Sequence, residues 1–248
     1  MLRTLAGAVA LWAALGLVGS AHALTFDVTV TDGMMTQEQP VEATYDDVTG
    51  LYTSDPNAAG DLGMPGRWMF MDFEVTFNPD PNISASFNVV NSLTGTMPSN
   101  FTITVEAPIA ALATTVRGGS AQGGVTDAGG DGATLGLLGT PAFYTALVDG
   151  AAAHTLYSDP NGSLTVGAFL SGNLSPLEDF GTPIPSLPGG AVNTKIGIQF
   201  NFSLTPNNDR ATGSGVFVVE LPEPSTFLAS GAFLLLPLFG MRVRRKRG

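Results

Sequence analysis

The sequence predicts an all-β protein, an antiparallel β-sandwich or jelly-roll-like domain with an N-terminal signal helix and a C-terminal transmembrane helix. Three observations support this prediction. Short segments alternate apolar and polar residues, no stretch of the exported segment shows a convincing helical period, and clusters rich in Pro, Asn and Asp separate the alternating segments. Alternation with a period of two is typical of a strand with one buried face.

The first 23 residues have the features of a cleavable signal peptide. Arg3 is the only early positive charge, and an uncharged, mostly apolar run extends from Leu5 to Val18. Ala21 and Ala23 then fit the small-residue rule of signal peptidase. We therefore expect cleavage after Ala23 and a mature chain that begins at Leu24.

Seven segments carry the strand pattern in chain order: 24–30, 69–77, 85–89, 101–105, 164–170, 196–204 and 216–221. In the second of these, Met69, Met71 and Phe73 are expected to face the core, with Asp72 and Glu74 on the opposite face. Three stretches interrupt the pattern, at 32–67, 117–140 and 171–195, and are expected to be loops or irregular strands.

The C-terminal 27 residues contain three consecutive features. Pro222-Glu223-Pro224-Ser225 precedes an uncharged segment, 225–241, and a basic tail, 242–248. As a helix, the uncharged segment would be about 25 Å long, slightly less than a hydrocarbon core of roughly 30 Å. Because basic residues remain cytoplasmic, this segment predicts a transmembrane helix with residues 24–221 outside the membrane. The tail supplies the cytoplasmic stop, through Arg242, Arg244, Arg245, Lys246 and Arg247.

These three features together resemble the PEP-CTERM sorting signal of Gram-negative bacteria. Pro222, Glu223 and Pro224 match the family motif, and Ser225 is its usual follower, whereas Leu221 replaces the valine that often precedes it. The resemblance covers only 222–248. It implies recognition by exosortase, a membrane-embedded cysteine peptidase-like enzyme, then transfer to the cell surface or to exopolysaccharide.

The charge of the exported segment excludes some partners. Residues 24–221 contain four basic residues against 20 acidic ones, a formal net charge of −16. Such a domain is repelled by nucleic acid and by anionic lipid, and it attracts divalent cations or polycations. The chain has no cysteine, so it can form neither a disulfide nor a thiolate site.

No residue pattern predicts a catalytic site. After signal cleavage His154 is the only histidine, which argues against a His-rich zinc centre, and it is expected at a strand edge or in a loop. No G-x-S-x-G elbow nominates a nucleophile, and Gly213-Ser214-Gly215 lacks that spacing. Asp72 and Glu74 are the candidate acids for the alternative of a glycan-acting enzyme, which needs two carboxylates across a cleft.

The sequence predicts no cofactor, and calcium is the alternative that its oxygen ligands favour. Asn78, Asp80 and Asn82 imitate the opening of an EF-hand loop without its glycine and terminal glutamate. Asp46-Asp47 is an adjacent pair, and Asp127 and Asp131 converge on a glycine-rich loop; solvated acidic loops are the simpler interpretation of both.

Exposed aromatic side chains would indicate a sugar-binding platform, since carbohydrate-binding sandwiches expose such side chains. Trp68 is interpreted as a core residue in preference to a platform, and four tyrosines are expected near loops: Tyr45, Tyr52, Tyr144 and Tyr157.

These expectations combine into an exported, non-enzymatic surface or extracellular-matrix protein, associated with exopolysaccharide or biofilm as the resemblance implies. Its expected partners are signal peptidase, exosortase and, transiently, the inner membrane, with no nucleic acid. The alternatives are an extracellular glycan-acting enzyme and a calcium-dependent carbohydrate-binding or adhesive module.

Overall fold

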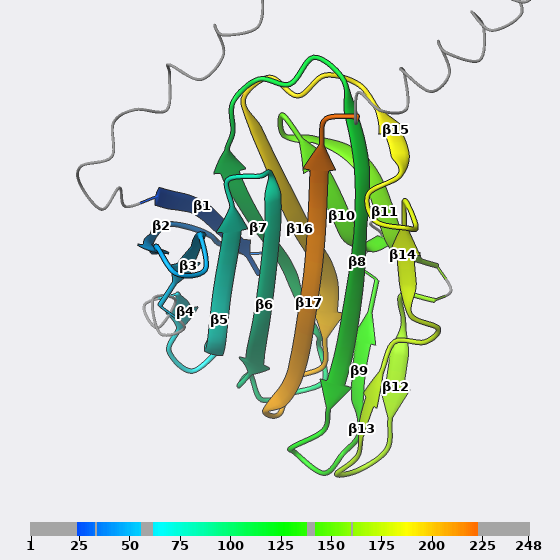
Figure 1. Ribbon diagram of the computed structural model, residues 1–248. Helices are drawn as coiled ribbons and strands as arrows, with labels where there is room; N and C mark the ends of the chain where they lie inside the picture. The colour runs from blue at the N-terminus through cyan, green and yellow to red at the C-terminus, as the bar shows by residue number, and fades with distance from the viewer. Residues whose placement is uncertain (1–23, 33, 56–61, 138–141, 160, 223–248) are drawn as a thin grey trace, which may run out of the picture.

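We describe a computed structural model that covers residues 24–32, 34–55, 62–137, 142–159 and 161–222. Over these residues the protein is all-β, and every strand pairing is antiparallel (Figure 1). The described part of the chain contains no helix long and apolar enough to span a bilayer. The signal helix expected at 1–23 and the transmembrane helix expected at 225–241 lie outside the described residues.

The chain forms seventeen strands within the described residues. They are β1 (Leu24–Thr31), β2 (Thr36–Asp46), β3 (Leu51–Ser54), β4 (Gly63–Met64), β5 (Trp68–Asn78), β6 (Asn82–Asn91), β7 (Ser99–Pro108), β8 (Thr115–Thr126), β9 (Ala133–Gly136), β10 (Ala142–Val148), β11 (Ala151–Ser158), β12 (Leu164–Val166), β13 (Ser171–Asn173), β14 (Glu178–Phe180), β15 (Leu187–Gly189), β16 (Lys195–Leu204) and β17 (Asp209–Glu220).

One continuous sheet curls strongly so that its two halves face each other in a sandwich-like arrangement (Figure 1). The first half has the order β11-β10-β16-β7-β1, and the second has the order β5-β6-β17-β8. Strands β2 and β3 link the halves through the pairings β1–β2, β2–β3 and β3–β5. The outer edge of β8 pairs in turn with β13, β14 and β15.

Aromatic rings fill the space between the two halves. The Phe87 ring of β6 lies 5.0 Å from that of Phe200 and 5.4 Å from that of Phe202, both on β16. Tyr144 of β10 reaches across and donates its hydroxyl to the Val216 carbonyl of β17 at 2.9 Å. Gly215 makes room for this ring, since a β-carbon there would lie 2.6 Å from Tyr144 Cε2. The core therefore depends on both aromatic bulk and glycine on the facing strand.

The alternating segments form the expected strands, with one error of register. β1, β5, β6, β7 and β16 cover five of the predicted segments, β17 covers 216–220 of a sixth, and only the start of 164–170 is a strand, β12. Within β5 an irregularity between Phe70 and Asp72 shifts the alternation. Trp68 and Phe70 consequently enter the core while Met69 and Met71 are exposed, so the prediction that these methionines face inward is wrong.

The glycine-rich stretch 117–140 is not mainly a loop. Most of it forms β8, a long strand between β17 and the three short strands at its outer edge, and β9. Gly123 lies against the ring of Phe143, and a β-carbon there would approach Phe143 Cζ to 2.8 Å. Glycine therefore serves close packing on this strand. The stretch 32–67 likewise contains β2, β3 and β4, whereas 171–195 contains three short strands separated by loops, in line with the expectation of loops or irregular strands.

Candidate functional site

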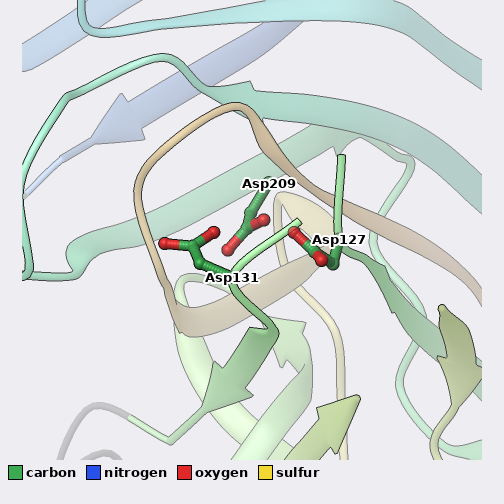
Figure 2. A group of neighbouring side chains, drawn as sticks. All are labelled: Asp127, Asp131 and Asp209. Atoms are coloured by element: carbon green, nitrogen blue, oxygen red, sulfur yellow. The ribbon is translucent and has the colours of Figure 1, made fainter. Parts of the chain in front are cut away.

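Three aspartates meet at the end of the sheet where β8 finishes and β17 begins (Figure 1, Figure 2). Asp127 follows β8, Asp131 lies in the β8–β9 loop, and Asp209 is the first residue of β17. One carboxylate oxygen from each residue lies within 4.8 Å of the corresponding oxygens of the other two. Among the described residues this is the one group of acids, histidines or cysteines with the geometry of a metal site.

Asp127 is the organising residue of its loop. Its Oδ1 accepts the Gly130 N–H at 2.9 Å, while its Oδ2 accepts the N–H groups of Phe169 at 2.7 Å and of Gly132 at 3.2 Å. Burial alone would raise the pKa of Asp127, but these backbone donors outweigh it and lower the pKa to about 2. Asp127 therefore remains an anion and ties the β8–β9 loop to the β12–β13 turn.

Glycine is required in this loop because the chain turns tightly around the carboxylate. Gly130 has a φ of +87°, and a β-carbon there would approach the ring of Phe169 to 2.3 Å. Both the left-handed backbone and the close ring exclude a side chain at this position. The sequence thus places the Gly130 N–H where Asp127 can bind it.

The surroundings of Asp209 disfavour its charged form, whereas those of Asp127 favour it. Its side chain is fully buried, Oδ2 accepts the hydroxyl of Thr205, and Oδ1 has no hydrogen-bond partner. Burial raises the pKa of Asp209 to about 6; the Thr205 hydroxyl opposes this, while the carboxylates of Asp127 and Asp131 reinforce it. Asp209 is a buried acid that faces two other acids.

Asp131 forms the accessible side of the group. It is exposed, and its Oδ2 accepts the Asn207 side-chain amide at 2.7 Å. Asn207 belongs to the turn between β16 and β17 and also bonds to Gly95. The loop and this turn are therefore held together on the solvent side of the cluster.

This arrangement can hold either a cation or a shared proton. Carboxylates that face each other without a counter-charge repel, and either partner removes the repulsion. The sequence predicted that Asp127 and Asp131 converge, but it gave no reason to add Asp209. The interpretation of this loop as solvated is wrong for Asp127, which is buried.

Two other candidate calcium ligands, Asp46 and Asn78, act as turn caps. Asp46 accepts the Val48 N–H at 2.9 Å and the Thr49 hydroxyl at 2.8 Å, between β2 and β3. Asn78 accepts the Asp80 N–H at 3.1 Å in the β5–β6 turn. These contacts are the usual chemistry of Asx turns.

Among the candidate catalytic residues, Glu74 and Ser214 line one groove, whereas His154 lies on another strand outside it. Asp72 and Glu74 lie on the exposed face of β5 as predicted. A shallow groove of about 300 Å³ crosses this face, and Glu74 is the one acid among its lining residues. His154 lies on β11 at the edge of the described sheet, stacked on Phe180 at 4.1 Å, and burial lowers its pKa. Ser214 lies on β17 and lines the groove.

The aromatic residues do not form an exposed platform. Trp68 is a core residue as predicted, and its indole N–H donates to Asp32 Oδ2 at 3.0 Å. Tyr144 and Tyr157 lie near the ends of β10 and β11 as expected, but both are fully buried and cannot contribute to a platform. Tyr45 and Tyr52 form one tilted pair at 4.9 Å, with Tyr45 exposed.

The residues predicted for export lie almost entirely outside the described part of the chain. Pro222 is described and half-buried, directly after the exposed Leu221. The remaining ones lie outside it: Ala21, Ala23, Glu223, Pro224, Ser225, Arg242, Arg244, Arg245, Lys246 and Arg247.

Comparison with protein-family models found no match, and neither the curated proteins nor the solved structures gave one.

Proposed function

We propose that this chain is an exported, non-enzymatic surface or extracellular-matrix protein, sorted by a PEP-CTERM signal at 222–248. The observation that carries the proposal is the junction between domain and signal. β17 ends at Glu220, Leu221 is 59% exposed, and the Pro-Glu-Pro motif begins at the next residue. A peptidase must bind its substrate as extended backbone. Because no further helix or strand lies between the end of β17 and the motif, the motif is accessible for such binding.

The β-sandwich itself fits a role outside the cell. Residues 24–221 carry a formal net charge of −16 and rely on an aromatic core in place of disulfides. High net charge of one sign favours solubility and opposes association with anionic surfaces. In this proposal the domain reaches the cell surface or the exopolysaccharide after exosortase has removed its anchor.

The distribution of acids supports a role without catalysis. Glycoside hydrolysis needs two carboxylates facing a substrate across a cleft, at roughly 5 to 10 Å. Among the described residues that line the groove over β5, β6, β17 and β8, Glu74 is the only acid. In the three-aspartate cluster, Asp127 and Asp209 are buried, so a sugar can reach only Asp131.

The proposal is tested by the mass of the mature protein from cells with and without exosortase. We expect signal cleavage after Ala23 in both, and loss of the residues that follow the Pro222 region only when exosortase is present. Replacing Pro222, Glu223 and Pro224 with alanine should block that loss, whereas Asp72→Ala, a change on the exposed face of β5, should not. An intact 242–248 tail in both strains would contradict the processing.

A further inference from the structure

We propose that Asp127, Asp131 and Asp209 bind one calcium ion, which joins the β8–β9 loop to the beginning of β17. This site is independent of the sorting signal. It lies at the end of the sheet opposite to the exit of the chain at Pro222 (Figure 1).

The unpartnered oxygen of Asp209 indicates a missing ligand. A fully buried carboxylate normally accepts several hydrogen bonds or pairs with a positive charge. Asp209 Oδ1 has neither, and its carboxylate is directed toward Asp127 and Asp131 (Figure 2). The ion pairs Arg67–Asp32 and Lys195–Glu106 involve no member of the cluster, and among the described residues no basic side chain forms an ion pair with it. Arg210 follows Asp209 but is exposed on the other face of the strand.

The spacing fits calcium. Calcium binds oxygen ligands at about 2.3–2.6 Å, so two ligands of one ion can be as much as about 5 Å apart. The three carboxylate oxygens lie within 4.8 Å of one another. Magnesium needs shorter bonds of about 2.0–2.1 Å in near-octahedral geometry, so it demands a tighter arrangement than calcium does. Because all three ligands are hard oxygens, softer metals such as zinc are less well matched.

The site is also held in place and accessible from one side. Backbone N–H groups fix Asp127, and the Asn207 amide holds Asp131. These contacts occupy part of each carboxylate and reduce the reorganisation that binding needs. Asp131 is exposed and provides the entrance, while the burial of Asp127 and Asp209 excludes water from the other ligands.

The test is a calcium titration of the full-length chain in mild detergent at neutral pH, after removal of metal with EDTA. We expect one saturable binding event per chain by calorimetry. Extracellular calcium modules bind with dissociation constants of roughly 10⁻⁴–10⁻³ M. A Tm that rises by several degrees and saturates over the same range should accompany binding, since a ligand of the folded state stabilises it.

Two variants and one control locate the ion. Asp209→Asn keeps the shape of the side chain and should abolish the calcium-dependent rise in Tm. In Asp131→Asn, at the exposed position, the new side chain can still accept the hydrogen bond from the Asn207 amide. This variant should lower the affinity for calcium at least about tenfold, because fewer ligand charges lower affinity. Asp72→Asn removes the same charge from the exposed face of β5 and should respond as the wild type does.

Three outcomes would overturn the proposal. The first is no saturable calcium response of the wild type, and the second is an undiminished response of Asp131→Asn. The third is an Asp209→Asn chain more stable than the wild type both in EDTA and in saturating calcium, which would indicate that a proton, and not an ion, bridges Asp209 and Asp127. An equal response to magnesium would overturn the choice of calcium.

Discussion

Asp32 and Asp209 are both buried, yet their surroundings differ in charge. Asp32 follows β1, and its Oδ1 accepts the N–H groups of Met34 at 3.0 Å and Met35 at 2.8 Å. Its Oδ2 accepts the Trp68 indole N–H and lies 3.4 Å from Arg67 Nη2. Asp209 has one hydroxyl donor and two acidic neighbours.

The difference shows in the pKa of each group. Burial opposes ionisation at both sites, but the N–H donors and Arg67 hold the pKa of Asp32 below its usual value, whereas that of Asp209 is raised. The fold provides the hydrogen-bond donors and the positive charge that stabilise the Asp32 carboxylate. At Asp209 it leaves one buried carboxylate oxygen without a hydrogen-bond partner.

The largest effect is expected from Asp32→Ala. This change leaves the buried indole N–H of Trp68 without an acceptor and Arg67 without its anion, which we expect to lower the free energy of unfolding by roughly 2–3 kcal/mol. Urea denaturation followed by tryptophan fluorescence measures it. The loss should be the same in calcium and in EDTA, because Asp32 is not part of the three-aspartate cluster.

Asp149 is a second aspartate that the fold satisfies, and we expect its replacement by alanine to have the next largest effect. Its carboxylate accepts the backbone N–H groups of Asn193, Thr194 and Lys195, which ties the β10–β11 turn to the start of β16. Asp149→Ala should lower Tm by several degrees, and Asp149→Asn by less. A calcium response that disappeared in either variant would contradict the separation of the two regions.

Lowering the pH should reveal the contribution of Asp32 through a change in stability smaller than those of the alanine variants. Because the folded-state pKa of Asp32 lies below its unfolded value of about 3.9, its contribution to stability is present above that value. The contribution is lost as the pH falls through the folded pKa. Between pH 7 and about pH 3, wild-type protein should therefore lose more stability than Asp32→Asn. Parallel loss in the two proteins, measured by urea midpoints, would contradict the role of Asp32.

The smallest effect is expected from Asp131→Asn in EDTA. The residue is exposed and asparagine can still accept from Asn207, so the free energy of unfolding should change by no more than about 0.5 kcal/mol. Measured beside Asp32→Ala in the same urea series, this variant tests whether the Asp131 carboxylate contributes to ligand binding more than to the stability of the fold. A loss comparable to that of Asp32→Ala would assign it a structural role.

The sequence predicts the regular strands well because period two is a local property. β1, β7 and β16 follow their alternating segments closely. The error at Met69 and Met71 has a physical cause, since one extra residue in β5, between Phe70 and Asp72, exchanges the faces of the strand relative to β6. For 117–140 the sequence leaves loop and irregular strand open, and the regular strand β8 could not be predicted, because its glycines make room for side chains from distant segments, among them Phe143.

The candidate site is predictable only in part. Asp127 and Asp131 are close in sequence and surrounded by glycine, so their convergence can be inferred. Asp209 is far away along the chain and joins them only because β17 pairs with β8 from its second residue onward. The Pro206-Asn207-Asn208 turn before it was recognisable, but no local signal links this turn to the loop at 127–132.

The placement of β17 has a mechanical consequence. This strand lies between β6 and β8, pairing with β6 from Asp209 to Val218 and with β8 from Arg210 to Glu220. Traction applied at Pro222 along the axis of the strand acts on both ladders in shear, so that their hydrogen bonds share the force and do not open one after another. A chain tethered through its C-terminal end would therefore resist flow through one of its most extensively paired strands.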